Sequence, residues 1–278
     1  MNPLIRFPDK AIVMPLRLFG SVEYYAAMSA FGTVYIDDTT RFDKRQKAVH
    51  RYSIIDTQGP LDLTVPIAKP KVSSKAPIDL ATPNVVEEGR KATWRDIALS
   101  SHGNWQHVHD VSLASAYGRT PFYEFYADRL KSFFAEDVVN SFKSIADYDL
   151  AADAVVRSIL GITTPVVMLS AVLKGQSMLL NAAHGLEKHL DGCLPNGQNR
   201  TLQNGSNSIV NSVESTNSIL PIEKANELIA SITPQEYYQV RESRFGFVGN
   251  LSILDLIFNI GPEAPLHLHR LTSKLKTE

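Results

Sequence analysis

Short apolar runs and one helical stretch alternate along the amino-terminal part of the chain. The runs Ala11–Met14 and Thr33–Ile36 predict two short strands. Between them, Val22–Ala30 predicts a helix with Ser21 as its N-cap and Gly32 at its end. A strand, a helix and a second strand within about 30 residues match the length of a βαβ unit. The pattern therefore predicts that the fold begins with such a unit.

A second pair of apolar runs has the composition of a β-hairpin. Tyr52–Ile55 and Leu61–Ile67 are rich in β-prone residues and flank Asp56–Pro60, a turn-forming segment that contains a glycine. Residues 68–92, which follow, are rich in proline and lysine. That composition predicts an extended connection on the surface.

Helical periodicity dominates from Trp105 onward. Trp105, His109, Leu113 and Tyr117 recur every four residues and predict one ridge of an amphipathic helix, which Gly118 ends. Further elements are predicted downstream: a helix with Thr120 as N-cap and Pro121 at its first position, a helix Leu150–Leu160 between Asp149 as N-cap and Gly161, a buried strand Thr164–Leu169, and helices at Ile222–Ile232 and Leu251–Asn259.

Mixed helices and strands without an internal repeat predict an α/β fold, with α+β as the alternative, in which helices flank a small central sheet. The 27 residues 194–220 contain six Asn and five Ser but only two charged residues. Such a tract cannot bury enough apolar area to offset the entropy of ordering it, so it predicts a mobile loop or insertion. We expect one domain over residues 1–278 that carries this insertion.

Composition and charge exclude several classes of protein. The 28 Lys and Arg residues nearly balance the 29 Asp and Glu residues, which argues against a nucleic-acid-binding protein that neutralises phosphates. The single cysteine, Cys193, excludes an internal disulfide framework and a cysteine-based zinc site. A secretory layout and an apolar run of about 18 residues are both absent, so we expect a cytoplasmic protein without a membrane span. Phosphate-loop, dinucleotide-binding and serine-hydrolase motifs are absent as well.

Three of the eight histidines lie close together, and one of them is a candidate for catalysis. On a helix, His107 and His109 point about 200° apart, so they cannot share a metal ion as neighbouring ligands, and no metal site is predicted. His109 lies on the apolar ridge, where its surroundings can shift its pKa, which makes it a candidate general acid or base. The alternative, which its position alone favours, is a hydrogen-bonded structural histidine.

Paired carboxylates end the second predicted strand. Asp37 and Asp38 stand where α/β sheets bind ligands, so they are candidates to hold a metal, a ribose hydroxyl or an ammonium group. Two aspartates after a strand also form turns, and without further context that reading is favoured.

A basic cluster follows the paired carboxylates. It gathers cationic or potentially cationic side chains within eight residues: Lys44, Arg45, Lys47, His50 and Arg51. Such a cluster suits a phosphate or carboxylate, with arginine as the bidentate donor. The alternative is a solvated face, and spacing does not decide between the two.

Several segments, in order along the chain, match the motifs of one family. They are Pro15 with Phe19–Gly20 and Tyr24–Ala27, the strand VYIDD at 34–38, FDKRQ at 42–46 with His50–Arg51, LTVPI at 63–67, Trp105 and His109 with Tyr117, TPFYEFY at 120–126, and YQV, RFGF and NLSILDL between 238 and 256. Through these segments the chain resembles the WbqC-like protein family. It departs from the family pattern at Gly249 and between the two matching blocks.

Members of that family occur among genes for O-antigen and other surface polysaccharides. The resemblance implies an enzyme that acts on a nucleotide-linked sugar and attaches an acyl or aminoacyl group to an amino sugar. In that hypothesis His109 acts as the base, Asp37 and Asp38 bind sugar hydroxyls or an amine, and the remaining positions bind substrate: Lys44, Arg45, His50 and Arg51 for the anion, and Trp105 and Tyr117 for stacking.

Other functions stay open at this point. A non-catalytic protein of the same pathway would use the same residues to hold a glycan precursor or a partner enzyme. A third reading makes the PFYEFY and LSILDLIF segments a homo-oligomer interface, although such apolar runs more often build the core. The sequence identifies no cofactor, sugar or donor.

Overall fold

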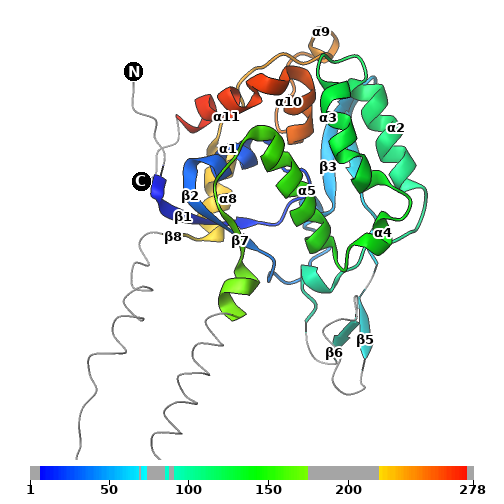
Figure 1. Ribbon diagram of the computed structural model, residues 1–278, viewed down its shortest axis with the longest axis vertical. Helices are drawn as coiled ribbons and strands as arrows, with labels where there is room; N and C mark the ends of the chain where they lie inside the picture. Colours follow the sequence, from blue (N-terminus) through cyan, green and yellow to red (C-terminus); the bar gives the residue numbers. More distant parts are fainter. Residues whose placement is uncertain (1–6, 69, 74–84, 88–90, 175–218, 274–278) are drawn as a thin grey trace, which may run out of the picture.

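The computed structural model describes residues 7–68, 70–73, 85–87, 91–174 and 219–273 (Figure 1). Its central element is a four-stranded parallel sheet with the strand order β7-β2-β1-β8. These strands are β1 (Phe7–Pro15), β2 (Phe31–Asp37), β7 (Val166–Met168) and β8 (Ile219–Leu220). The fold is therefore mixed α/β with a small parallel sheet, and this prediction is confirmed.

The predicted βαβ unit is present and forms the middle of the sheet. Helix α1 (Val22–Ala30) joins β1 to β2, which pair in register from Ala11 with Thr33 to Pro15 with Asp37. The side chain of Ser21 caps α1 by accepting a hydrogen bond from the Tyr24 amide at 3.3 Å. The helix prediction is thus confirmed.

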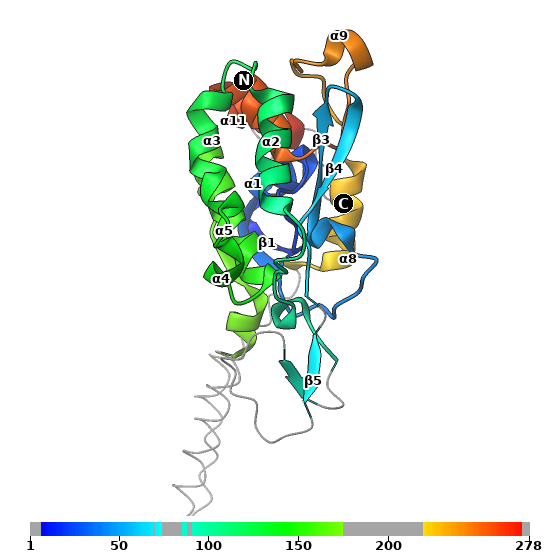
Figure 2. The same ribbon diagram turned by 90° about the vertical axis from the view of Figure 1, so that its right-hand side faces the viewer.

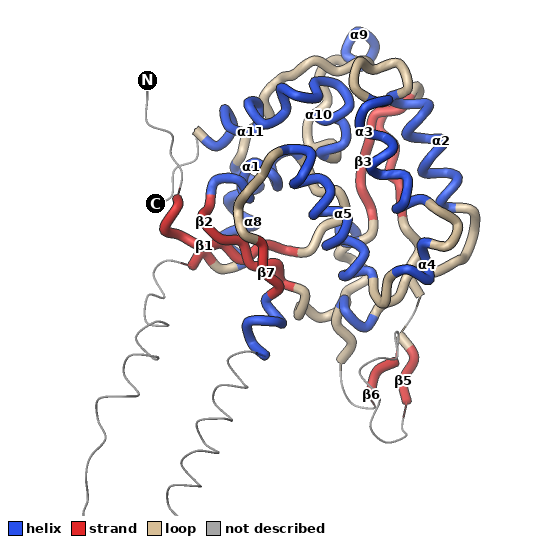
Figure 3. Tube along the Cα trace, viewed as in Figure 1, coloured by secondary structure: helices blue, strands red, loops and turns tan. Residues whose placement is uncertain are grey.

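Two smaller strand pairs lie outside the parallel sheet. Strands β3 (Arg51–Asp56) and β4 (Gly59–Thr64) form the predicted antiparallel hairpin. Strands β5 (Lys71–Ser73) and β6 (Val85–Glu87) pair in parallel within the segment that we predicted as an extended connection. Figure 3 shows the hairpin standing apart from the parallel sheet, among the helices.

Helices surround these strands. They are α2 (Trp105–Tyr117), α3 (Tyr123–Leu130), α4 (Val138–Ser141), α5 (Ile145–Leu160), α8 (Ile222–Ser231), α9 (Glu242–Phe245), α10 (Ile253–Ile260) and α11 (Ala264–Thr272), with single 3-10 turns η1 (Lys47–Val49), η2 (Trp94–Asp96), η3 (Lys131–Phe134) and η5 (Gly261–Glu263). Figure 2 shows α3 and α5 on one side of the molecule, the hairpin and α8 on the other, and α1 between them. Within the described residues, no helix combines the length and the apolar character that crossing a membrane requires.

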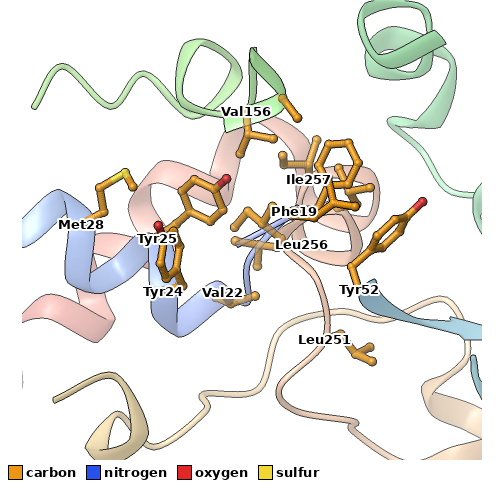
Figure 4. Packing of buried hydrophobic residues seen from close by; sticks show 14 of the residues in the cluster. Phe19, Val22, Tyr24, Tyr25, Met28, Tyr52, Val156, Leu251, Leu256 and Ile257 are labelled. Carbon is orange, nitrogen blue, oxygen red and sulfur yellow. The ribbon is translucent and has the colours of Figure 1, made fainter. Parts of the chain in front are cut away.

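The core is centred on α1, which is buried almost all round. Figure 4 shows Tyr25 directed from α1 toward Val156 of α5, while Phe19 lies against Leu256 and Ile257 of α10. Phe19 also packs edge-to-face on Tyr52 of β3, with ring centroids 5.0 Å apart. The same hydrophobic core thus joins the parallel sheet, the hairpin and the carboxyl-terminal helices.

Three helix boundaries differ from the predictions. Gly32 does not end α1, because β2 already begins at Phe31. Thr120 is not an N-cap: its hydroxyl donates to the Tyr117 carbonyl at 2.7 Å, and the next helix starts at Tyr123. Asp149 is not an N-cap either, since α5 begins at Ile145 with Ser144 as its cap, which places Asp149 inside the helix and buries it.

Two strand predictions need adjustment. The strand expected to be buried at Thr164–Leu169 is the short edge strand β7, whose side chains are half-buried because only β2 pairs with it. The second hairpin strand ends at Thr64, before Pro66, rather than at Ile67. Residues 194–218 of the predicted insertion lie outside the described residues.

A glycine at the end of α10 allows close packing against Phe122. Gly261 has φ +48°, and a Cβ atom added there would lie 2.4 Å from the Phe122 ring. We therefore expect Gly261→Ala to lower the free energy of unfolding by about 2 kcal/mol or more, through backbone strain and overpacking together. Urea unfolding measures the loss.

Gly161 provides the matched control for this substitution. It ends α5 with φ +63° but has open space where a Cβ would stand. Gly161→Ala should therefore cost only the strain, about 1 kcal/mol. Equal losses in the two variants would contradict the proposed clash with Phe122.

Candidate functional site

The carboxyl ends of β2 and β7 bring three polar side chains together. Asp38, the residue after β2, is fully buried. Ser170, two residues after β7, donates to its carboxylate from the backbone amide at 2.9 Å and from the hydroxyl at 2.6 Å. Arg95 of η2 donates to the same carboxylate from Nη1 and forms an ion pair with it. This group lies at the edge where open α/β sheets bind ligands.

Arg95 is both anchored and accessible. Its Nη1 also contacts the Met168 sulfur at 3.4 Å and the Ser170 hydroxyl at 3.2 Å, yet 32% of its side chain is exposed. A capping box of Thr93 and Asp96 holds the turn that carries it. Since guanidinium has five donors, the group can bind an external anion while Asp38 fixes its position.

The pKa of Asp38 reflects these contacts. Burial alone would raise it, but hydrogen bonds from Ser170 and Arg95, together with the Arg95 charge, lower the pKa below its ordinary value. Asp38 is therefore a carboxylate at neutral pH. Its role in this geometry is to hold Arg95.

Asp37 does not form a pair with Asp38. Its Oδ1 accepts hydrogen bonds from the backbone amides of Thr39 and Thr40, at 2.9 Å and 3.0 Å, and from the Thr39 hydroxyl at 2.7 Å. Its Oδ2 accepts from the Thr40 hydroxyl. These bonds build a turn, which is the alternative that we considered for this residue.

The basic cluster is not brought together on one surface. Arg45 is exposed and paired with Asp43 at 3.0 Å, while Arg51 donates to Thr64 and reaches Asp62 at 3.3 Å. His50 is buried, with Nδ1 at 3.1 Å from the Val65 carbonyl, and burial lowers its pKa. Lys44 is exposed on the segment between β2 and η1.

His109 lies in an aromatic core, and both of its ring nitrogens have partners. Nε2 is 3.2 Å from the Thr64 carbonyl and Nδ1 is 3.1 Å from the Tyr52 hydroxyl. Because a carbonyl only accepts, Nε2 carries the proton and Nδ1 accepts from Tyr52. Burial lowers the pKa of His109 to about 4, against the opposing effect of the Thr64 bond. The ring is therefore neutral at pH 7.

The two aromatic residues predicted for stacking are also internal. Trp105 donates from its indole nitrogen to the Ser100 carbonyl at 3.1 Å, and its ring packs on His109. Tyr117 is fully buried and donates to Asp255 at 2.8 Å. Both rings are thus packed inside the protein and are not exposed to stack on a ligand. Figure 1 shows α2, which carries them, well away from the end of β7.

Sequence reasoning missed Arg95 and Ser170. The capping-box pattern of Thr93 and Asp96 was a local signal for the turn that presents Arg95. Ser170 follows a predicted strand at nearly the same offset as Asp38. The rule that placed Asp38 at the carboxyl edge of the sheet therefore predicts the same place for Ser170. In the part of the chain that the structure describes, no three His, Cys, Asp or Glu side chains gather as metal ligands.

A cavity lies near the amino-terminal end of β2. Ser29, Gly161, Thr164 and Thr272 are among its lining residues, and Thr164 bonds the Phe31 carbonyl at the start of β2. Asp38 stands at the other end of that strand. The cavity is thus separate from the Arg95 site.

Comparison with known proteins identifies the family but no individual relative. No curated protein sequence and no solved structure matches the chain. The model of the WbqC-like protein family matches residues 80–267, which is more than half of the 278 residues. The chain therefore belongs to the WbqC-like protein family, whose name associates it with polysaccharide biosynthesis.

Proposed function

We propose that this protein is an enzyme of surface polysaccharide biosynthesis that binds a nucleotide-linked sugar at the carboxyl edge of its parallel sheet. In this proposal it transfers an acyl or aminoacyl group to the amino group of that sugar. The observation that supports it is Arg95, whose side chain is about one third exposed and is held by the buried Asp38 and by Ser170. The diphosphate of a nucleotide sugar is the anion that such a group suits.

The surroundings of Arg95 favour an extended anionic ligand. The backbone amide of Trp94 donates to the Thr40 carbonyl at 3.3 Å, and Phe42 donates to the Ala92 carbonyl at 2.9 Å. These bonds place the segment after β2, with the exposed Lys44, against the turn that carries Arg95. We propose Lys44, two residues beyond Phe42 on that segment, as a second cation for the diphosphate.

The transfer step follows from the substrates proposed. The sugar amine attacks the activated carbonyl carbon, the bond to the donor's leaving group breaks, and the amine gives up its proton. The protein contributes by holding the two reactants in line. The assignment of His109 as the proton acceptor stays a prediction. It requires the ring to release Tyr52 from Nδ1 and the sugar amine to reach α2, which lies away from the end of β7.

A non-catalytic binding protein is the second candidate. The observation that favours it is that the predicted catalytic residues are all occupied: both nitrogens of His109 and the carboxylates of Asp37 and Asp38 have internal partners. Such a protein would hold the same nucleotide sugar at Arg95 without turnover.

The test of the binding site is Arg95→Ala. We expect the dissociation constant for a nucleotide-linked amino sugar, measured by calorimetry, to rise about 10- to 100-fold, because charge-assisted hydrogen bonds to the diphosphate are lost. Arg119→Ala removes an exposed arginine at the end of α2 and should leave binding unchanged. Equal affinity of Arg95→Ala and the wild-type protein would place the ligand elsewhere.

Turnover separates the two candidates. The wild-type protein is incubated with the nucleotide amino sugar and an acyl or aminoacyl donor, and the product mass is followed. Acylated sugar supports the enzyme, whereas binding without product favours the binding protein. Absence of binding to every nucleotide sugar tried would reject both.

A further inference from the structure

The cavity near the start of β2 lies where three helices end. Ser29 is in the last turn of α1, Gly161 follows the last residue of α5, and Thr272 is the last residue of α11. All three residues line the cavity, and Figure 1 shows α1, α5 and α11 close together. With a volume of about 110 Å³, the cavity has room for a ligand of a few non-hydrogen atoms.

Three hydroxyl groups in the lining present hydrogen-bond acceptors to this space. Each donates its own hydrogen to a backbone carbonyl: Ser29 to Ala26 at 2.9 Å, Thr164 to Phe31 at 3.2 Å and Thr272 to His269 at 2.8 Å. A hydroxyl has one hydrogen and two acceptor lone pairs, so each of the three retains acceptor capacity only. The cavity therefore suits a ligand that brings hydrogen-bond donors.

Helix ends, rather than ionised side chains, determine the charge of the cavity. The carboxyl end of a helix carries a partial negative charge from carbonyls that have no partner within the helix. Among the described residues that line the cavity there is no Asp, Glu, Lys or Arg, and the titratable side chain is His269. Arg270, the next residue of α11, is exposed and outside the lining. The three helix ends thus favour positive charge in the cavity.

We propose that this cavity binds a small molecule through a primary ammonium group. The three N–H donors of such a group match the three acceptor hydroxyls of Ser29, Thr164 and Thr272, and the helix ends stabilise its charge. An anion would instead meet hydroxyls whose hydrogens are already donated and the negative ends of three helices. This ligand is distinct from the nucleotide sugar at Arg95, and the proposal does not depend on the proposed enzyme activity.

The test measures thermal unfolding of the full chain at pH 8, without any nucleotide sugar, over a concentration series of methylammonium chloride. Tetramethylammonium chloride at the same concentrations is the reference, because its ion carries the same charge but has no N–H donor. A ligand that binds only the folded protein raises the unfolding temperature. We expect a midpoint several degrees higher in methylammonium once its concentration is far above the dissociation constant.

Serine and threonine variants locate the site. Ser29→Ala removes one acceptor and should raise the dissociation constant of methylammonium about tenfold, because a hydrogen bond from a charged group is lost. Thr164→Val should have the same effect. Ser231→Ala is the matched control: Ser231 ends α8, lies outside the lining, and donates to a carbonyl three residues earlier at 2.7 Å, as Ser29 does. It should keep the wild-type response.

Either of two results would overturn the proposal. Equal midpoints in the two salts at every concentration would mean that the cavity does not bind an ammonium group. A wild-type response in both Ser29→Ala and Thr164→Val would place the amine elsewhere on the protein. Arg95→Ala should keep the full response, so the outcome is independent of the proposed nucleotide-sugar site.

Discussion

Replacing Asp255 with alanine is expected to lower the free energy of unfolding by about 3–5 kcal/mol. The carboxylate is fully buried and accepts three hydrogen bonds: from the Tyr117 hydroxyl at 2.8 Å, the Tyr237 hydroxyl at 2.7 Å and the Gln239 side-chain amide at 2.9 Å. Alanine removes the acceptor, so the hydroxyls of Tyr117 and Tyr237 lose their partner at a cost of about 1–3 kcal/mol each, while the Gln239 amide keeps only its bond to the Val248 carbonyl at 2.9 Å. Urea unfolding at neutral pH measures the loss.

Asp255 has a structural effect because it joins distant segments. Tyr117 ends α2, Gln239 lies before α9, and Asp255 stands in the first turn of α10. Asp110→Ala, at an exposed aspartate of α2, is the control and should change the free energy of unfolding by less than about 0.5 kcal/mol. A loss below about 1 kcal/mol in Asp255→Ala would mean that these three donors find other partners.

Acidification is expected to destabilise the protein by about 3 kcal/mol between pH 7 and pH 4 through His109 alone. Its pKa is about 4 in the folded protein, below the ordinary histidine value of 6.5, because burial disfavours the charged ring. In this interval the unfolded chain binds more protons than the folded one, so stability falls as the pH drops. The loss begins near the unfolded pKa and is complete below the folded pKa. Urea unfolding at several pH values measures it.

A pair of variants isolates this contribution. His109→Gln keeps a polar side chain in the core but cannot titrate, so the slope of stability against pH between 4 and 6.5 should become shallower. His107→Gln removes an exposed histidine two residues away and is the matched control. If both variants keep the wild-type slope, His109 does not bind its proton differently in the two states.

Local patterns predicted the elements whose boundaries are set by nearby residues. Ser21 caps α1 through its own hydroxyl, and Gly161 ends α5 in the left-handed conformation, and both were visible in the sequence. The sequence pattern predicts Asp149 as an N-cap, whereas the helix begins at Ile145 and encloses it. Its burial depends on the packing of α1 against α5, which no local pattern contains.

The candidate site was predicted only in part, for the same reason. The position of Asp38 after a strand pointed to the carboxyl edge of the sheet, where Arg95 and Ser170 also lie. Its partners Arg95 and Ser170 are 57 and 132 residues away in sequence, so their contact depends on the register of the whole sheet. The basic residues after Asp38 were expected to act together, but strand pairing directs Arg51 toward Thr64 and Asp62 instead.

The burial of α1 also determines when the chain can fold during synthesis. The helix belongs to the first strand–helix–strand unit, but α8, α10 and α11, from the other end of the sequence, pack against it. A ribosome-bound chain that lacks these three helices would expose Val22, Met28 and other apolar residues of α1. We therefore expect the core around α1 to be completed only after α11 has left the ribosome, and the apolar surface exposed until then favours aggregation.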